Sequence, residues 1–320
     1  MFWVLIMRSL LTAGIIIVLL VACAGCTGTP GTGAATTEKP AYSVDDKGIL
    51  SVTCAAVTTS EEVLVSNETY TKSRIVMHAQ GGDVVTYLAA PKNPKAAIVY
   101  APGAGEKIAG HEERMVRYAA AGYAFMFVDT RGNGAETPGM PFSQQLVQQD
   151  FSRFENGDWP QYYLSVCDLM SAQKIVSDRF SVPVYAMGSS NGGRYAAVAT
   201  GVDPQFAGYV GISTSNWGLL DSVIQQGYAG DPVRFATSIE PGTYFPKIAP
   251  RPVWIFHAEG DPIIPFASGK QFFDSAQEPK TFTKFSGDHG INNNVDTQII
   301  MQWAQIYGPR ESISISSREV

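Results

Sequence analysis

Short apolar segments alternate with helical segments along most of this chain, and this alternation is the feature that most restricts its fold. The apolar runs are five to seven residues long and cover 96–101, 123–128, 182–187, 206–212, 252–257 and 281–285. Helical composition occupies 112–121, 162–176, 194–200 and 297–307 between and after them. Strands that are apolar on both faces and separated by helices form a parallel sheet covered on both sides. The pattern predicts an α/β fold, preceded by β-rich runs at 49–57, 73–79 and 83–90.

Composition narrows the possible classes of protein. The chain has 320 residues, enough for one large α/β domain with a tether or for two ordinary domains. Hydrophobic residues make up 45%, and charged residues only 16%. This excludes a coiled coil, a disordered polymer and a polytopic membrane protein. The net charge is −6 and no Lys/Arg run occurs, so we expect no nucleic-acid partner.

The first 22 residues are typical of an export signal. Arg8 precedes the apolar stretch 10–22, and small residues follow before a cysteine. Leu20-Val21-Ala22-Cys23 resembles a lipobox, which predicts lipid attachment at Cys23. Cys26 is a second candidate, and an uncleaved anchor helix over 9–26 or plain secretion are the alternatives. Each alternative predicts an exported protein, held at the outer face of the cell membrane or released.

The predicted domain boundaries follow from this signal. Residues 23–42 are rich in Thr, Gly, Ala and Pro and predict a flexible tether, 43–308 the folded domain, and 309–320 a polar tail. Cys54 and Cys167 would then lie in an oxidising compartment. The sequence leaves open whether they form a disulfide or remain two buried thiols.

A G-x-S-x-G motif follows one of the predicted parallel strands. Gly188-Ser189-Ser190-Asn191-Gly192 stands between the strand at 182–187 and the helix at 194–200. In this context the central serine projects from a very tight turn, and glycines leave room for neighbouring backbone. Ser190 is therefore the predicted nucleophile. The free N–H of Asn191, at the start of the helix, is a predicted oxyanion donor.

A base and an acid for this serine come from later strand ends. His289 lies in a glycine-flanked loop after the last predicted strand, and Asp261 follows the strand at 252–257. The order serine, acid, histidine is that of a nucleophile elbow with its partners. Glu259 is a rival for the acid. His257, four residues before Asp261, is expected to be only a neighbour at the strand end.

The remaining predicted site residues concern oxyanion binding and the substrate pocket. Pro102-Gly103-Ala104-Gly105 follows the strand at 96–101, and the N–H of Ala104 is the predicted second oxyanion donor. His111 is expected to be a solvated residue at the start of a helix. A small cap is expected over about 217–246, where Trp217, Tyr244 and Phe245 could line an acyl pocket, with core packing as the alternative role for each.

At this point the chain resembles an α/β-hydrolase from about residue 70 to residue 308. The likeness rests on four features in the correct order: PGAG, DTRGNG, GSSNGG, and the acid and histidine of EGDPIIP and SGDHG. Family resemblance implies that serine attacks a carbonyl, that an acyl-enzyme forms and that water releases it. The segment SNGG also resembles prolyl-oligopeptidase-like peptidases and some secreted polyester or feruloyl esterases.

These observations predict an exported serine hydrolase acting on a small-molecule carboxylic ester. The alternatives are a short-peptide peptidase of the prolyl-oligopeptidase-like type and a surface binding protein that uses an inactive hydrolase fold. No spacing typical of a metal site occurs outside the export signal, so we expect neither a cofactor nor a metal.

Overall fold

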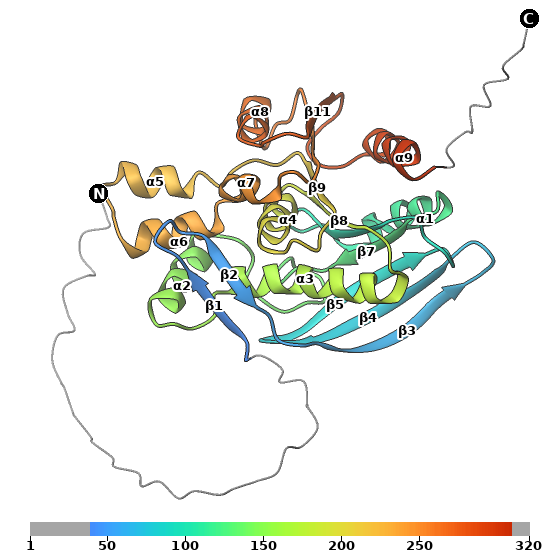
Figure 1. The fold of residues 1–320 in the computed structure, drawn as a ribbon, viewed down its shortest axis with the longest axis horizontal. Helices are drawn as coiled ribbons and strands as arrows, with labels where there is room; N and C mark the ends of the chain where they lie inside the picture. The colour runs from blue at the N-terminus through green and yellow to red at the C-terminus, as the bar shows by residue number, and fades with distance from the viewer. Residues whose placement is uncertain (1–38, 309–320) are drawn as a thin grey trace, which may run out of the picture. The chain divides into compact units, whose positions relative to one another are not determined.

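The computed structural model describes residues 39–308, which form one sheet of nine strands, a separate two-stranded sheet and the surrounding helices (Figure 1). The predicted signal, Cys23, Cys26, most of the tether and the polar tail lie outside these residues. Within 39–308, none of the helices has both the length and the apolar character needed to cross a bilayer.

The large sheet follows the predicted alternation. Its strands are β3 (Thr58–Ser66), β4 (Thr71–Ala79), β5 (Gly82–Ala90), β6 (Ala97–Ala101), β7 (Ala124–Val128), β8 (Val184–Ser189), β9 (Gly208–Ile212), β10 (Val253–Ala258) and β11 (Lys280–Phe285). They are ordered β11-β10-β9-β8-β6-β7-β5-β4-β3. Neighbours from β11 to β7 pair in parallel, and β5, β4 and β3 continue the sheet with antiparallel pairing.

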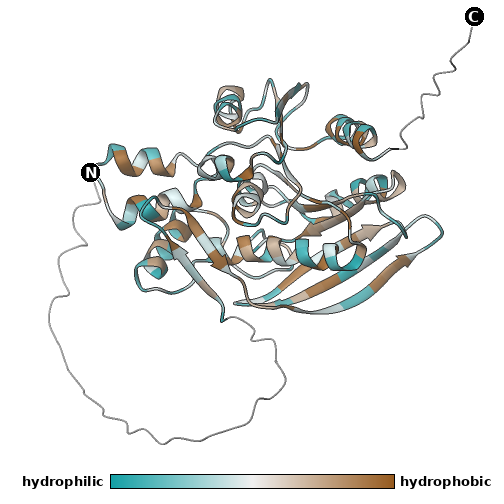
Figure 2. Ribbon diagram, in the orientation of Figure 1, coloured by the Kyte–Doolittle hydropathy of each residue, from teal (hydrophilic) through white to brown (hydrophobic). Residues whose placement is uncertain are grey.

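Helices cover both faces of this sheet. They are α1 (Glu112–Ala120), α2 (Gln144–Glu155), α3 (Gln161–Phe180), α4 (Asn191–Val202), α5 (Leu219–Gln225), α6 (Asp231–Ile239), α7 (Phe245–Ile248), α8 (Phe266–Asp274) and α9 (Asn293–Tyr307), with short 3₁₀ turns η1 (Ile108–Gly110) and η2 (Pro241–Tyr244). Figure 2 shows teal and brown bands alternating around the helices, as expected when each buries one side.

The core is divided by the sheet into two apolar clusters, and β7 shows how. Its residues Ala124, Met126 and Val128 pack in the cluster that includes α3 and α4. Phe125 and Phe127 pack in the cluster that includes α1 and α9. Alternate side chains of a strand point to opposite faces, so a strand with no polar positions must be covered on both.

The sequence pattern missed the strand β3 and the helix α2. Every residue of β3 is exposed, and the strand lies at the sheet edge, paired only with β4. An exposed edge strand does not need the apolar run that makes buried strands recognisable. In place of the expected β-rich run 49–57, the structure has the shorter strand β2 (Leu50–Thr53). It pairs with β1 (Ala41–Val44) and does not join the large sheet. The fold thus begins two residues before the predicted boundary at 43.

Cys54 and Cys167 form a disulfide, which resolves the pairing that the sequence left open. The bond joins the segment after β2 to the middle of α3, across a separation of 113 residues. Closing so long a loop restricts the unfolded chain strongly, and in the chain-entropy description it stabilises the fold by about 4–5 kcal/mol.

Parallel pairing determines where the functional loops meet. The loops after β6, β8, β10 and β11 all leave the same edge of the sheet. β6 lies between β7, which follows it in the chain, and β8, which comes after both. Loops on the two sides of such a switch point diverge and leave a crevice, where ligands bind in open α/β sheets.

Candidate active site

Ser190 occupies a strained turn between β8 and α4. Its backbone has φ 51° and ψ −119°, a conformation that residues other than glycine rarely adopt. The Ser190 N–H donates to Ile212 O at 2.9 Å, and Thr214 Oγ1 donates to Ser190 O at 2.8 Å. These bonds hold the turn. The adjacent Ser189 ends β8 and is fully buried, so only Ser190 is presented at the sheet edge.

The glycines of the motif are required by close approach of backbone. A Cβ on Gly188 would overlap the backbone of Gly192, and a Cβ on Gly192 would overlap the carbonyl of Ala101 at the end of β6. The turn can therefore come this close to β6 only when both positions lack a side chain. This contact brings the start of α4 against the loop that follows β6.

The structure brings His289 and Asp261 together. His289 Nδ1 lies 2.9 Å and 2.8 Å from the two carboxylate oxygens of Asp261. An ionised carboxylate can only accept, so Nδ1 carries the proton and Nε2 is left as an acceptor.

The carboxylate of Asp261 is held in the ionised form. Burial acts to raise its pKa, but N–H donors at Ile264 and Ile263 and the bond from His289 outweigh this effect. The two backbone donors each lie 2.9 Å from Oδ1. The pKa of Asp261 therefore lies below the ordinary aspartate value, and the side chain can orient an imidazole and stabilise its cation.

The rival residues occupy other positions. Glu259 is exposed and pairs with Lys284 at 2.9 Å. His257 is fully buried at the end of β10, where Nε2 lies 2.9 Å from Ile264 O and 3.6 Å from Asp261 Oδ2. Burial lowers the pKa of His257, which favours the neutral ring.

Among the described residues, no hydrogen bond joins Ser190 Oγ to His289. The two loops nonetheless lie close, because a Cβ built on Gly290 would come within 3.6 Å of Ser189 Oγ. Contacts between a nucleophile and its base are often long without substrate and shorten when substrate binds. The geometry thus joins the acid and the base directly and places the serine on the neighbouring turn.

Among the described residues, the backbone N–H groups of Ala104 and Asn191 have no hydrogen-bond partner. In the loop after β6, the N–H of Gly103 donates to Glu106 Oε2, that of Gly105 to Asn133 Oδ1 and that of Glu106 to Gly103 O. Within that stretch of the described chain only the N–H of Ala104 remains free. Asn191 is the first residue of α4, where an N–H has no partner in its own helix.

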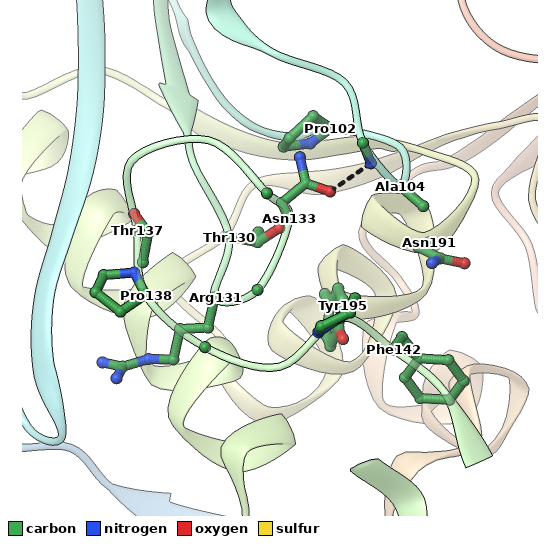
Figure 3. Close-up of a pocket in the computed structure, with 15 residues that line it drawn as sticks. Pro102, Ala104, Thr130, Arg131, Asn133, Thr137, Pro138, Phe142, Asn191 and Tyr195 are labelled. Carbon is green, nitrogen blue, oxygen red and sulfur yellow. Dashed lines mark hydrogen bonds between the residues drawn. The ribbon is translucent and has the colours of Figure 1, made fainter. Parts of the chain in front are cut away.

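Ala104 and Asn191 are among the residues that line one cavity of about 320 Å³, whereas Ser190 and His289 are not among its lining residues. Its wall is formed largely by the loop between β7 and α2, with contributions from Pro102, Ala104, Gly105, Asn191 and Tyr195. Figure 3 shows Ala104 and Asn191 on one side of this cavity and Thr137 and Pro138 on the other. This wall was not among the features predicted from the sequence, although a stretch rich in Gly and Pro directly after a parallel strand could have indicated it.

Of the three residues considered for an acyl pocket in the 217–246 segment, two take the other expected role, core packing. Tyr244 and Phe245 are fully buried in the core, and Tyr244 packs where a side chain on Gly201 of α4 would stand. Trp217 is half-buried and stacks on Phe142, a residue of the cavity wall, with 3.5 Å between ring centroids. This segment therefore contacts the cavity wall through the stacking of Trp217 on Phe142, and the end of the segment packs in the core.

His111 is also not the solvated residue that was expected. It is buried, with Nε2 3.2 Å from Glu106 Oε2 and Nδ1 bonded to Arg114. Arg114 in turn binds Asp296 of α9 at 3.0 Å. A position at a helix start indicates solvent only if no other element packs against it. Here the rings of Tyr100 of β6 and Phe127 of β7 lie against the imidazole.

Residues 92–229 match a family model described as serine aminopeptidase, S33. No curated protein matches the chain.

Several solved structures share its fold. Acetyl xylan esterase 1 from Thermoanaerobacterium sp. JW/SL YS485 is 13% identical, with a TM-score of 0.60 over 78% of this chain and 88% of that one. The acetyl xylan esterase from Paenibacillus sp. R4 is 15% identical, with a TM-score of 0.61 over 78% and 89%. A glucuronoyl esterase from Teredinibacter turnerae T7901 is 14% identical, with a TM-score of 0.53 over 82% and 81%. Together with the sheet order and the turn at Ser190, this likeness establishes that the chain has the α/β-hydrolase fold.

Proposed function

We propose that this chain is an extracytoplasmic serine hydrolase that cleaves small carboxylic esters through an acyl-enzyme. The observation that carries the proposal is the pair of free N–H groups at Ala104, in the loop after β6, and at Asn191, directly after the strained Ser190; both residues line one cavity. Donors fixed in this way stabilise a negatively charged oxygen as it forms, which is commonly the largest single contribution to acyl transfer.

The reaction follows from the positions of the groups. Ser190 Oγ attacks the ester carbonyl while His289 Nε2 takes its proton, and the carbonyl oxygen becomes an oxyanion between the two N–H donors. The tetrahedral intermediate collapses, its C–O bond breaks, and His289 returns the proton to the departing alcohol. Water then attacks the acyl-enzyme by the same route and releases the carboxylic acid and free Ser190. Asp261 holds the imidazole throughout.

A small acyl group fits the cavity best. About 320 Å³ is near the lower end of ligand-pocket volumes. Phe142, Pro138, Pro141 and Tyr195 give part of its lining an apolar character. Solved acetyl xylan esterases of the same fold support the choice of short acyl esters.

A short-peptide peptidase is the second candidate, because the matching family model is described as a serine aminopeptidase. The two functions are separated by comparing kcat/KM for p-nitrophenyl acetate, butyrate and octanoate with that for aminoacyl p-nitroanilides. We expect the two short esters to be the best substrates and octanoate to be slower by about tenfold or more as the pocket fills. Ser190→Ala is the matched control for background hydrolysis.

Anilides that react faster than the best ester would replace the ester proposal with the peptidase. Absence of all turnover, together with no labelling of Ser190 by a fluorophosphonate, would favour a binding protein on an inactive hydrolase fold.

The proposed location outside the cytoplasm rests on the N-terminal signal and on the Cys54–Cys167 disulfide. Disulfides persist mainly in oxidising compartments. Intact mass of the mature N-terminus tests the anchor: lipidation at Cys23 should add acyl chains there, and Cys23→Ala should abolish them. A mature chain that begins at Met1 would favour the anchor helix, and one that begins at Cys26 would favour the second lipobox.

A further inference from the structure

The loop that carries the Ala104 N–H is attached to the wall of the substrate cavity through one side chain, Asn133. Its Oδ1 accepts from the N–H of Gly105 at 3.0 Å, and its Nδ2 donates to the carbonyl of Glu106 at 2.7 Å (Figure 3 shows the first bond). The amide thus binds one donor and one acceptor of adjacent residues. Only an amide in this orientation can make both bonds.

The other side of the loop is held from within the core. The Glu106 carboxylate accepts from the N–H of Gly103 at 2.8 Å and from Tyr100 OH at 3.3 Å, and His111 Nε2 lies 3.2 Å away. Burial acts to raise the pKa of Glu106, but the bond from His111 and the other donors lower it below the ordinary value, so the carboxylate is ionised. These contacts fix the beginning of the turn but do not reach the Gly105 end.

We propose that Asn133 is a positioning residue that aims the Ala104 N–H at the oxyanion. This inference rests on the proposed function and deepens it. The Ala104 N–H belongs to the peptide whose carbonyl, Gly103 O, accepts from the Glu106 N–H at 3.1 Å. The peptides on either side are held by Glu106 Oε2, at the Gly103 N–H, and by Asn133 Oδ1, at the Gly105 N–H. The free N–H must point at the oxyanion within a narrow angle, because hydrogen bonds weaken steeply as they bend.

The choice of asparagine also has an electrostatic reason. An aspartate at 133 could still accept from Gly105 but could not donate to the carbonyl of Glu106. It would also add a second negative charge near the forming oxyanion, beside the carboxylate already present at Glu106. A neutral amide supplies both bonds without opposing the charge that develops in the reaction.

The test uses two variants, Asn133→Ala and Asn133→Asp. The control is Asn156→Ala, which changes an exposed asparagine at the end of α2. Loss of alignment of one oxyanion donor should lower kcat for p-nitrophenyl acetate by about 10- to 100-fold in both Asn133 variants, with little change in KM. Affinity for phenylboronic acid, which forms a tetrahedral anionic adduct with the serine oxygen, should fall in parallel. The control should match the parent protein.

A merely structural role predicts a different result. If both folded variants keep the parent kcat and the parent affinity for phenylboronic acid, the proposal is wrong. A change confined to KM would assign Asn133 to substrate binding and would also overturn it. Thermal unfolding shows which variants fold, and the near-isosteric Asn133→Asp serves if the alanine variant does not.

Labelling by a fluorophosphonate separates this proposal from the proposed function. Ser190 Oγ attacks its phosphorus and fluoride leaves, and negative charge develops on the phosphoryl oxygen in the same site. The labelling rate constant of Asn133→Ala should therefore fall about as far as kcat. A parent protein that labels at Ser190 yet hydrolyses no ester would overturn the ester function only, and the labelling rates would then decide the role of Asn133. A parent protein that does not label would overturn both.

Discussion

At the scale of single residues, Asp261 lies between two histidines, His289 and His257, which are oriented in different ways. His289 donates a hydrogen bond from Nδ1–H to the carboxylate, which leaves its Nε2 free. The Nε2 of His257, in contrast, is bonded to the carbonyl of Ile264. A base needs a free acceptor nitrogen within reach of the nucleophile. We therefore propose His289 as the base and a packing role for His257.

The first prediction concerns these residues. Ser190→Ala and His289→Ala should each lower kcat by about 10⁴-fold or more, because the three groups act as a unit. Asp261→Asn should cost about as much or less. Melting temperatures of the serine and histidine variants should stay near that of the parent protein, as measured by circular dichroism.

His257→Ala is the matched comparison. The loss of a fully buried ring should lower the free energy of unfolding by about 1–3 kcal/mol and leave most of the activity. An activity loss equal to that of His289→Ala, with unchanged stability, would mean that the base is wrongly assigned.

At the scale of elements, the loop between β7 and α2 forms the pocket wall and is ordered by contacts with buried polar groups. The Asp129 carboxylate accepts from the N–H groups of Glu136 and Thr137 at 2.6 and 2.7 Å. Arg131, from the same loop, binds the buried Asp168 of α3 at 2.7 Å. These contacts give a glycine-rich loop a defined shape, so that it can determine which acyl groups fit.

The second prediction tests that wall. Phe142→Ala should remove the ring that closes the cavity in front of Trp217 and should raise the ratio of octanoate to acetate kcat/KM by about tenfold. Trp217→Phe keeps a ring behind Phe142 and should change this ratio little. If both variants retain the parent ratio, acyl length is selected elsewhere.

The third prediction concerns the covalent link between the start of the domain and α3. Replacing both Cys54 and Cys167 by Ala should lower the free energy of unfolding by about 2–5 kcal/mol in urea titrations. Reductant should destabilise the parent protein by a similar amount and leave the double variant unchanged. In a fragment of residues 39–308, whose cysteines are Cys54 and Cys167 alone, alkylation of two thiols in the unreduced, unfolded protein would contradict the disulfide.

At the scale of the whole molecule, the strand β1 connects the start of the fold to the segment behind the pocket. Arg234 of α6 binds the carbonyls of Val44 and Asp45, and the ring of Tyr42 packs on Tyr163 of α3 with 5.1 Å between centroids. The boundary of the stable domain should therefore lie before β1.

The fourth prediction compares two truncations. A fragment of residues 39–308 should keep kcat/KM within about twofold of the longer chain, since every described contact of the site lies inside it. A fragment of residues 47–308 loses β1 and should unfold more easily by about 1–3 kcal/mol. Equal stability of the two fragments in urea would show that β1 adds nothing measurable.

The sequence alone was sufficient to predict the parallel sheet and the order of the functional loops. Buried strands need apolar residues on both faces, and the motif around Ser190 needs glycines where backbone approaches backbone, so both leave a local pattern. Because parallel strands present their carboxyl ends at one edge, residues after different strands can be grouped without knowing any distance. That reasoning placed Asp261 and His289 on loops that the structure brings into contact.

Only the tertiary structure decided what packs behind and around that site. The burial of His111, Tyr244 and Phe245, the disulfide and the cavity wall all depend on contacts between segments far apart in the chain. Local composition is the same whether such a residue faces solvent, substrate or core. The choice is made when elements pack against one another, because each side chain then takes the environment that the neighbouring helices and loops leave to it.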